Sequence, residues 1–271
     1  DDDMDFTILG LSILEDYAAD FTSVDVGSAW LNRLPYKLVY PAERVAYRSL
    51  INDLLPPSSA LTDNPFREWI GAQIRADMWG YVTPGWPEKA AEMAFRDASI
   101  SHTKNGVYGA MFVAALLAAS FATSNIKAVI DIALSEVPAN CRLAQAVKDT
   151  MAWAEANDDW QDTWALVNEK FGHYPDVHTI NNAALIVMGL VHGKGDFEQT
   201  IVTTVLGGWD ADCTGATAGS VIGLILGAKA LPEKWVGVFN DQIHSAVRGY
   251  EHCRFSDLAQ RTCRFADANR P

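Results

Sequence analysis

Apolar residues recur along this chain with the spacing of buried helices rather than of strands. In the first segment Phe6, Ile8, Leu9 and Leu11 cover most of a helix surface, which is typical of a helix buried on several sides. Similar spacing recurs in segments that cover most of the chain, at residues 43–55, 66–80, 87–100, 106–123, 126–136, 142–156, 159–171, 179–192, 196–206, 212–230 and 241–266. Prolines and glycines separate these segments, and no long alternating pattern is present. The sequence therefore predicts an all-α fold, a bundle of about a dozen helices.

The chain shows no internal boundary. With 271 residues, 49% of them hydrophobic, it can bury a large core. No linker rich in glycine, serine or proline divides it, so we expect residues 1–271 to form a single domain. The uncharged run from Gly106 to Ile126 approaches the length of a membrane span. Because it contains Ser120, Thr123 and Asn125, we interpret it as a buried helix of a soluble protein.

Charge and cysteine content exclude several classes of protein. The formal net charge is −13, and nucleic-acid-binding surfaces instead show clustered lysine and arginine. Four cysteines without close pairing indicate a reducing compartment, and we expect a cytoplasmic location. Four of the first five residues are acidic, so the chain does not open like a signal peptide.

Two acidic motifs at opposite ends of the chain carry the candidate chemistry. Near the C-terminal end, Asp210 and Asp212 follow a glycine pair and open a long uncharged helix, where the helix dipole favours anions. Asp1, Asp2 and Asp3 precede the first apolar helix. Adjacent carboxylates repel one another, so they are either solvated in a frayed end or neutralised by a cation. Carboxylate oxygens suit Mg²⁺, Ca²⁺ or Mn²⁺, and the motifs therefore predict a metal site.

The helix after the second motif has a ridge of glycines. Gly215, Gly219, Gly223 and Gly227 recur every four residues. A glycine inside a helix costs about 1 kcal/mol relative to alanine, so four of them require a reason. Small residues at this spacing let another backbone approach closely, and we expect such an approach here.

These motifs resemble those of the ADP-ribosylglycohydrolases, which include the dinitrogenase reductase-activating glycohydrolases. That family pairs an early Thr-Asp-Asp-Thr motif with a late Gly-Gly-Asp-x-Asp-Thr motif, and residues 1–4 and 207–214 match them in order. Residues 97–102 (Asp-Ala-Ser-Ile-Ser-His) resemble the family's Asp-Ala-Ser-x-Thr-His stretch. Residues 182–185 and 195–198 resemble the lead-in to the late motif, so the similarity spans essentially the whole chain.

The chain also departs from the family pattern. Asp1 and Met4 stand in the two threonine positions of the early motif, and Asp2 and Asp3 then occupy the Asp-Asp positions. Cys213 replaces the late threonine, and a thiol is a poor ligand for Mg²⁺. The number of bound metals therefore stays open. The family also has a metal-contacting glutamate on a helix before the early motif, so we expect that a native N-terminal segment is missing from this chain.

The resemblance implies a helical bundle with two Mg²⁺ ions, Mn²⁺ being the alternative. It implies hydrolysis of the glycosidic bond between ADP-ribose, or a related riboside, and an acceptor; the partners would be ADP-ribosylated proteins or small ribosyl compounds. The expected catalytic residues are Asp2 and Asp3, which would orient or deprotonate the attacking water. The implied metal ligands are Asp1, Asp2, Asp3, Asp210, Asp212 and Cys213. Two alternatives remain: another two-metal hydrolase of nucleosides or phosphoesters, and a non-catalytic, crystallin-like protein.

Eight residues are candidate substrate contacts. His102, Asn105 and Gly106 precede a long helix whose N-terminus favours a diphosphate, although a helix-capping turn would have the same sequence. Gln73 and Arg75 lie where the family places a pocket-forming stretch, and Arg75 has the alternative of pairing with Asp77 or another carboxylate. Beside the acidic pair, Trp209 suits stacking on a base or ribose. The full set is Gln73, Arg75, His102, Asn105, Gly106, Tyr108, Gly208 and Trp209.

Overall fold

The computed structural model describes residues 2–269, which are mostly α-helical. The α-helices are α1 (Asp2–Tyr17), α2 (Ser23–Arg33), α3 (Pro41–Ile51), α4 (Ser58–Leu61), α5 (Asp77–Tyr81), α6 (Pro87–Ala98), α7 (Asn105–Ser120), α8 (Ile126–Ser135), α9 (Arg142–Ala156), α10 (Trp160–Phe171), α11 (Thr179–His192), α12 (Phe197–Leu206), α13 (Ala211–Leu226), α14 (Glu233–Val236) and α15 (Phe255–Ala268). Short 3₁₀ helices lie at Ala18–Asp20, Tyr36–Leu38, Ile70–Ala72, Ala228–Ala230 and Gly237–Phe239. Strands β1 (Gln242–His244) and β2 (His252–Arg254) form one antiparallel pair. The prediction of an all-α fold is confirmed.

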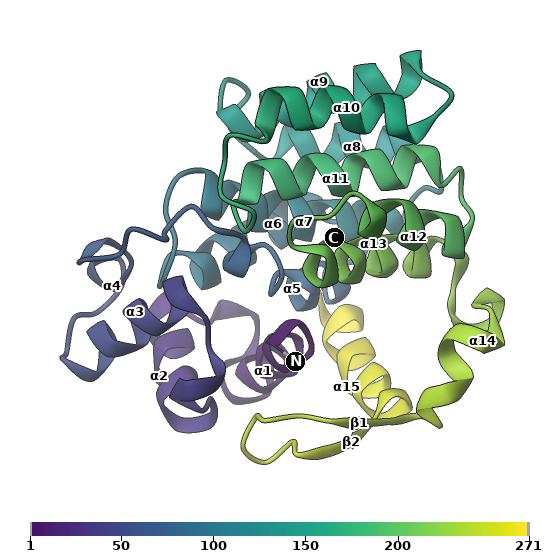
Figure 1. Ribbon diagram of the computed structural model, residues 1–271. Coiled ribbons are helices and arrows are strands. Elements are labelled where there is room, and N and C mark those ends of the chain that lie inside the picture. The colour runs from purple at the N-terminus through teal and green to yellow at the C-terminus, as the bar shows by residue number, and fades with distance from the viewer. Residues whose placement is uncertain (1, 270–271) are drawn as a thin grey trace.

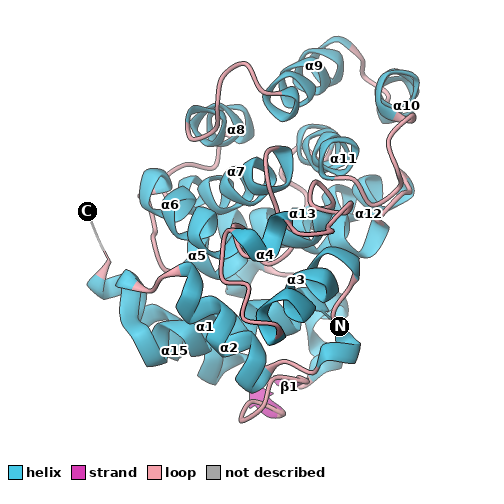
Figure 2. Cartoon of the chain, turned by 90° about the vertical axis from the view of Figure 1, so that its left-hand side faces the viewer, coloured by secondary structure: helices cyan, strands magenta, loops and turns pink. Residues whose placement is uncertain are grey.

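Two helices, α7 and α11, occupy the middle of the bundle. In both views α8, α9 and α10 lie on one side of them, and α1, α2 and α15 lie on the other (Figures 1 and 2). Helix α7 packs against α5, α6 and α8, and also contacts α13. Its apolar residues surround the whole helix because it has neighbours on all sides. No helix in the described part of the chain is long and apolar enough to span a membrane.

Buried apolar residues connect most of the bundle into one main cluster. This cluster runs from Phe6 in α1 to Tyr250 in the hairpin connection. Trp30 and Trp79 are among its largest fully buried side chains, and Phe21 stacks on Trp79 with ring centroids 4.7 Å apart. A shared core of this kind agrees with a single domain over residues 1–271, which stays a prediction.

Two segments predicted as helices are not continuous helices. Within 66–80 the backbone forms turns and a short 3₁₀ helix, and an isolated bridge pairs Trp69 with His178. The segment 241–266 begins as the β1–β2 hairpin, whose connection is fixed when Asp5 Oδ1 accepts hydrogen bonds from Ser245 Oγ (2.8 Å) and Ala246 N (2.9 Å). Contacts with distant parts of the chain override the apolar spacing in both segments.

The glycine ridge of α13 faces the side chains of α12. A methyl group on Gly215 would lie 2.7 Å from Val205 Cγ2, and one on Gly223 would lie 3.9 Å from Phe197 Cε2. Gly227 has a φ of 75° and ends the helix. Helix α12 packs closely along α13, and the atoms nearest the ridge belong to its side chains; a direct backbone contact along the ridge stays a prediction.

The open space beside Gly223 leads to a stability prediction. Gly223→Ala should raise the free energy of unfolding by up to about 1 kcal/mol, because alanine favours the helix and its methyl group meets only an ordinary contact. Urea denaturation followed by circular dichroism measures this change. Gly80→Ala is the contrast, since its methyl group would lie 2.7 Å from the Ala114 carbonyl oxygen, and it should destabilise. Destabilisation by Gly223→Ala would contradict the packing described here.

Candidate functional site

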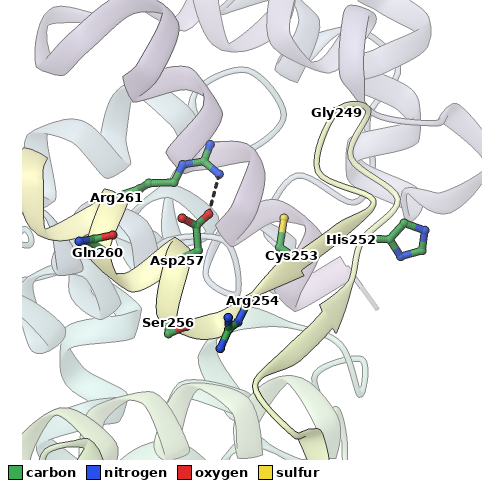
Figure 3. Close-up of a pocket in the computed structure, with 8 residues that line it drawn as sticks. All are labelled: Gly249, His252, Cys253, Arg254, Ser256, Asp257, Gln260 and Arg261. Carbon is green, nitrogen blue, oxygen red and sulfur yellow. Dashed lines mark hydrogen bonds and ion pairs between the residues drawn. The ribbon is translucent and has the colours of Figure 1, made fainter.

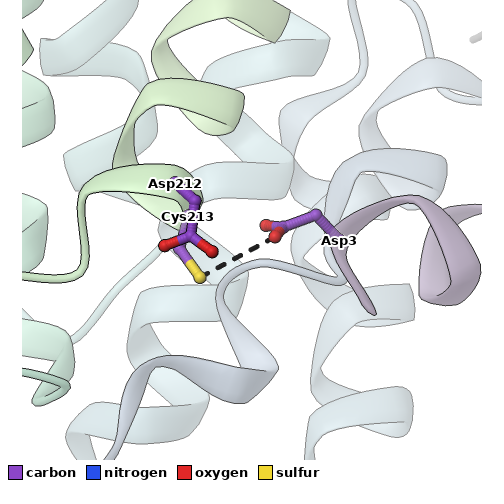
Figure 4. A group of neighbouring side chains, drawn as sticks. All are labelled: Asp3, Asp212 and Cys213. Atoms are coloured by element: carbon purple, nitrogen blue, oxygen red, sulfur yellow. Dashed lines mark hydrogen bonds between the residues drawn. The ribbon is translucent and has the colours of Figure 1, made fainter. Parts of the chain in front are cut away.

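The structure brings together the first turns of α1 and α13. Asp3 in α1 and Asp212 and Cys213 in α13 each offer a ligand atom, and these atoms lie within 4.8 Å of one another. Figure 4 shows the three side chains converging from the two helices, with the Cys213 thiol donating to Asp3 Oδ2 at 3.8 Å. Both helix N-termini direct positive dipole ends towards this point, which favours carboxylates there.

A tight turn positions the late motif. Gly208 and Trp209 have positive φ angles of 82° and 53°, so the chain reverses sharply between α12 and α13. For a tryptophan this backbone conformation is uncommon and costs on the order of 1 kcal/mol or more. The turn ends at Asp210, whose backbone N–H donates to Asn182 Oδ1 at 3.2 Å. Backbone strain is thus concentrated immediately before the two carboxylates.

Burial and the charges of neighbouring carboxylates make Asp2, Asp3 and Asp210 hard to ionise. Burial, together with the charges of Asp2 and Asp77, raises the pKa of Asp3 to about 7. Burial also raises the pKa of Asp210 to about 6, and lifts the pKa of Asp2 above its usual range, with Asp212 adding to the shift. A nearby cation would reverse these shifts.

The donor set fits a hard divalent cation through its carboxylates. Oxygen ligands from Asp3 and Asp212 suit Mg²⁺ or Mn²⁺. Cys213 is buried, and burial together with the charge of Asp3 raises the pKa of its thiol far above the usual range. The sulfur is therefore a protonated hydrogen-bond donor to Asp3, and its role as a metal ligand stays a prediction. Asp1 lies outside the described residues.

A cavity of about 200 Å³ lies beside the cluster, and we call it the acidic cavity. Asp2, Asp210 and Asp212 contribute its acidic side. The other side comes from the start of α3 and from the irregular segment before α5. The lining residues are Asp2, Tyr40, Pro41, Ala42, Glu43, Trp69, Ile70, Gly71, Ile74, Val177, Asp210, Asp212 and Cys213. Sequence reasoning missed Tyr40, Glu43 and Trp69.

A second, apolar cavity of about 540 Å³ lies between α1, α5, α13 and α15 and includes Asp3. At its polar edge, buried Asp77 accepts hydrogen bonds from Ser220 Oγ at 2.5 Å and Tyr81 Oη at 3.1 Å. Burial raises the pKa of Asp77 to about 6. Because Asp2 lines the acidic cavity and Asp3 the apolar one, the first turn of α1 faces both.

A wider hollow of about 770 Å³ lies at the surface beside the hairpin and the start of α15 (Figure 3). Its labelled residues include His252, Arg254 and Asp257, which are exposed, and Arg261, which pairs with Asp257 at 3.4 Å. None of the sequence-predicted site residues among those described lines this hollow. It is therefore separate from the candidate site.

Arg75 lies in the core rather than in either cavity. Its Nε donates to Asp97 Oδ2 at 2.6 Å, and its Nη1 donates to Glu43 Oε1 at 2.9 Å. The remaining donors reach the carbonyls of Gly71 and Asp97 and the hydroxyl of Ser101. Arg75 therefore forms ion pairs with carboxylates, which was the alternative to a substrate contact considered from the sequence. Its partners are Glu43 and Asp97 rather than Asp77.

Other predicted substrate contacts are buried behind the cavity wall. Gln73 Oε1 accepts a hydrogen bond from Thr179 Oγ1 at 2.7 Å, and His102 Nδ1 lies 2.8 Å from Ser101 Oγ. Asn105 donates to Glu68 Oε2 at 2.7 Å and accepts from a backbone N–H of α9. None of these three lines the acidic cavity.

The last four predicted contacts also lie outside the cavity lining. A methyl group on Gly106 would lie 2.6 Å from the Arg67 carbonyl oxygen, so this glycine permits close packing. Tyr108 is half-buried against the main core cluster, as is Trp209. Gly208 and Trp209 reach the site only through the turn that leads into Asp210.

Comparison with known proteins bears on the family and the fold of the chain. The family model described as ADP-ribosylglycohydrolase matches residues 1–266. Among solved structures, a chain of an "ADP-ribosylglycohydrolase-related protein complex" is similar with a TM-score of 0.65 and 15% identity. The match covers 99% of this chain and 81% of that one, and at this identity it bears on the fold alone. A search of curated proteins gave no match.

The buried position of Arg75 leads to a stability prediction. Arg75→Met should lower the free energy of unfolding by about 3–5 kcal/mol, because it leaves the carboxyls of Glu43 and Asp97 buried without their cation. Thermal and urea unfolding measure the loss. Arg254→Met is the control, because Arg254 and its partner Asp241 are in contact with solvent, and stability should hardly change. Equal effects of the two substitutions would refute the structural role of Arg75.

The raised pKa of Asp3 predicts how stability varies with pH in metal-free protein. Asp3 has a pKa of about 7 when folded against 3.8 unfolded, so the folded state binds the proton more tightly. Stability should therefore fall as pH rises from about 4 to about 7. Asp3→Asn should remove much of this fall and stabilise the metal-free protein at pH 8 by on the order of 2 kcal/mol.

Denaturation in EDTA across this pH range tests the prediction. The same variant should show a smaller rise of Tm on addition of Mn²⁺, because one oxygen ligand has lost its charge. Asp131→Asn, at an exposed position on α8, is the matched control. An unchanged pH dependence in Asp3→Asn would show that Asp3 is already ionised.

Proposed function

The chain belongs to the ADP-ribosylglycohydrolase family, and from that premise we propose that it hydrolyses the glycosidic bond between ADP-ribose, or a related riboside, and an acceptor. The observation that carries the proposal is the meeting of the two acidic first turns of α1 and α13 at one cavity. Cleavage of a glycosidic bond develops positive charge on the sugar, which nearby carboxylates stabilise. The proposed substrates are ADP-ribosylated proteins and small ribosyl compounds.

We propose that Asp2, Asp3, Asp210 and Asp212 hold divalent cations. Mg²⁺ is the expected ion, with two ions in the site, and Mn²⁺ is the alternative. When bound, such a cation supplies a polarised water near neutral pH and offsets the negative charge of the cluster. The raised pKa values of Asp3 and Asp210 support this assignment, because these carboxylates resist ionisation when no cation is bound.

The residues of the site have different proposed roles in the hydrolysis. Asp2 and Asp3 orient the attacking water and accept its proton. Tyr40 and Trp69 line the cavity, and we propose that a sugar ring packs against them. Trp209 and its neighbour Gly208 hold the turn that positions Asp210, and a direct contact of either with substrate stays a proposal.

The remaining predicted substrate residues support the wall of the cavity. Gln73 joins the segment before α5 to α11, and Asn105 joins the start of α7 to Glu68 and α9. We propose that they act by holding this segment in place. All four cysteines are free, which supports the expected cytoplasmic location.

One observation favours a second candidate, a non-catalytic crystallin-like protein. Cys213 places a protonated thiol, a poor ligand for Mg²⁺, among the carboxylates. The four carboxylates argue for catalysis instead, because a purely structural protein gains nothing from their mutual repulsion.

Hydrolysis of a panel of ADP-ribosylated substrates, with and without Mg²⁺, tests the proposed function. The protein should release ADP-ribose only with the metal present. Asp210→Asn and Asp212→Asn should reduce turnover at least 100-fold, a loss comparable to removal of a key catalytic group, while helicity stays unchanged. Asp131→Asn again serves as the exposed control.

Three results would count against the proposal in different ways. Full activity of both variants in EDTA would exclude the metal mechanism. Absence of saturable Mg²⁺ or Mn²⁺ binding by calorimetry would favour the non-catalytic protein. Phosphoester or nucleoside hydrolysis that free ADP-ribose does not inhibit would indicate the other two-metal hydrolase.

A further inference from the structure

Glu43 is a buried carboxyl group on the wall of the acidic cavity. It belongs to the first turn of α3 and is 3% exposed. Among the described residues that line this cavity, it is the one carboxyl outside the two acidic motifs. A methyl group on Gly71 would collide with Glu43 Oε1. The absence of a side chain at this position therefore makes room for the carboxyl.

The surroundings of Glu43 contain one positive charge for two carboxyl groups. Arg75 contacts Glu43 Oε1 at 2.9 Å and Asp97 Oδ2 at 2.6 Å, and all three side chains are buried. His102 Nε2 lies 3.8 Å from Glu43 Oε1, but burial and the charge of Arg75 hold the pKa of this histidine far below its usual value. The imidazole is therefore neutral and adds no positive charge.

Charge balance then requires a proton in this cluster. A buried and uncompensated anion is costly, so the two carboxyl groups together retain one proton. Asp97 has the shorter contact with the guanidinium, and its backbone carbonyl accepts a second bond from Arg75 at 3.1 Å. Glu43 has the longer contact and also faces the negative charge of Asp2. Burial accordingly raises the pKa of Glu43 to about 7, with Arg75 opposing the shift.

We propose that Glu43 is the general acid of the hydrolysis, donating its carboxylic proton to the acceptor atom that leaves the ribose; this role rests on the proposed function. Glycoside hydrolysis pairs a carboxylic acid at the leaving group with carboxylates that promote attack by water. The carboxylates of the two motifs are unsuited to the first task, because they must be ionised to hold a cation.

The reaction balances without a further reagent. The bond from the anomeric carbon to the acceptor breaks, its electron pair goes to the acceptor atom, and that atom takes the proton of Glu43. A water oxygen bonds to the anomeric carbon, and its proton passes to the carboxylate of Asp2 or Asp3. Exchange with solvent returns a proton to Glu43. Arg75 and Asp97 act as positioning residues, since they hold Glu43 and set its protonation.

Dependence on the leaving group tests this assignment. The two probes are an ADP-ribosyl serine peptide, whose alkoxide must be protonated as it leaves, and a p-nitrophenyl glycoside of ADP-ribose, whose phenolate leaves without help. Glu43→Gln keeps the size of the side chain. It should reduce turnover of the peptide by about 10²–10⁴-fold and that of the aryl glycoside by less than about tenfold.

Infrared spectroscopy of metal-free protein provides a readout that does not depend on activity. Protein labelled with ¹³C-glutamate should show an isotope-shifted carboxylic C=O band at pH 6, which separates Glu43 from the buried aspartic acids. The band should be absent in Glu43→Gln. It should also disappear in Asp97→Asn, because Arg75 is then left with one carboxyl and Glu43 ionises. Asp97→Asn should also move the alkaline limb of the pH–rate profile to lower pH.

The possible failures can be told apart. Equal losses of Glu43→Gln on both probes, or no glutamic acid band in wild-type protein, would overturn the general-acid role while the proposed function stands. If wild-type protein cleaves neither probe nor any ADP-ribosylated substrate, the proposed function itself fails, and this role fails with it.

Discussion

Repulsion among closely spaced carboxylates, of which Asp3 is buried, is the constraint on which the candidate site depends. The fold places Asp3 and Asp212 close together at the meeting of two helix N-termini, although they belong to opposite ends of the chain. The positive ends of the helix dipoles offset part of this charge, worth about 0.3–1 kcal/mol for each group. The rest must come from protons or from a cation, and the choice between them depends on pH and metal concentration.

The two carboxyls beside Arg75 also lie close together, but here Arg75 supplies the positive charge that offsets their repulsion. The guanidinium lies between Glu43 and Asp97 and is held by its full set of donors. The molecule thus contains two groups of carboxyls beside one cavity, of which one has Arg75 as an internal cation and the other is the proposed metal site. The acidic cavity is lined by both groups, with Glu43 on one side and Asp2, Asp210 and Asp212 on the other.

The sequence revealed the elements whose structure is local and missed those fixed by distant contacts. Helices such as α7 follow from a continuous apolar pattern. The turns before α5 and the β1–β2 hairpin depend on tertiary contacts, such as the bridge of Trp69 with His178 and the hydrogen bonds of Asp5. The convergence of the acidic motifs was expected from their chemistry. Glu43 was missed because it looks like one charged residue on an amphipathic helix, and only burial beside Arg75 distinguishes it.

The position of Arg75 shows that a sequence motif predicts which residues lie near a site better than it predicts which of them line the cavity. Arg75 and His102 lie within hydrogen-bond networks directly behind the cavity, where their donors and acceptors face Glu43, Asp97 and Ser101. A polar residue in such a place acts on substrate only through the group it holds. In the proposed hydrolysis, the chemistry of the cavity therefore depends on residues that do not line it, because they decide which lining carboxyl keeps a proton.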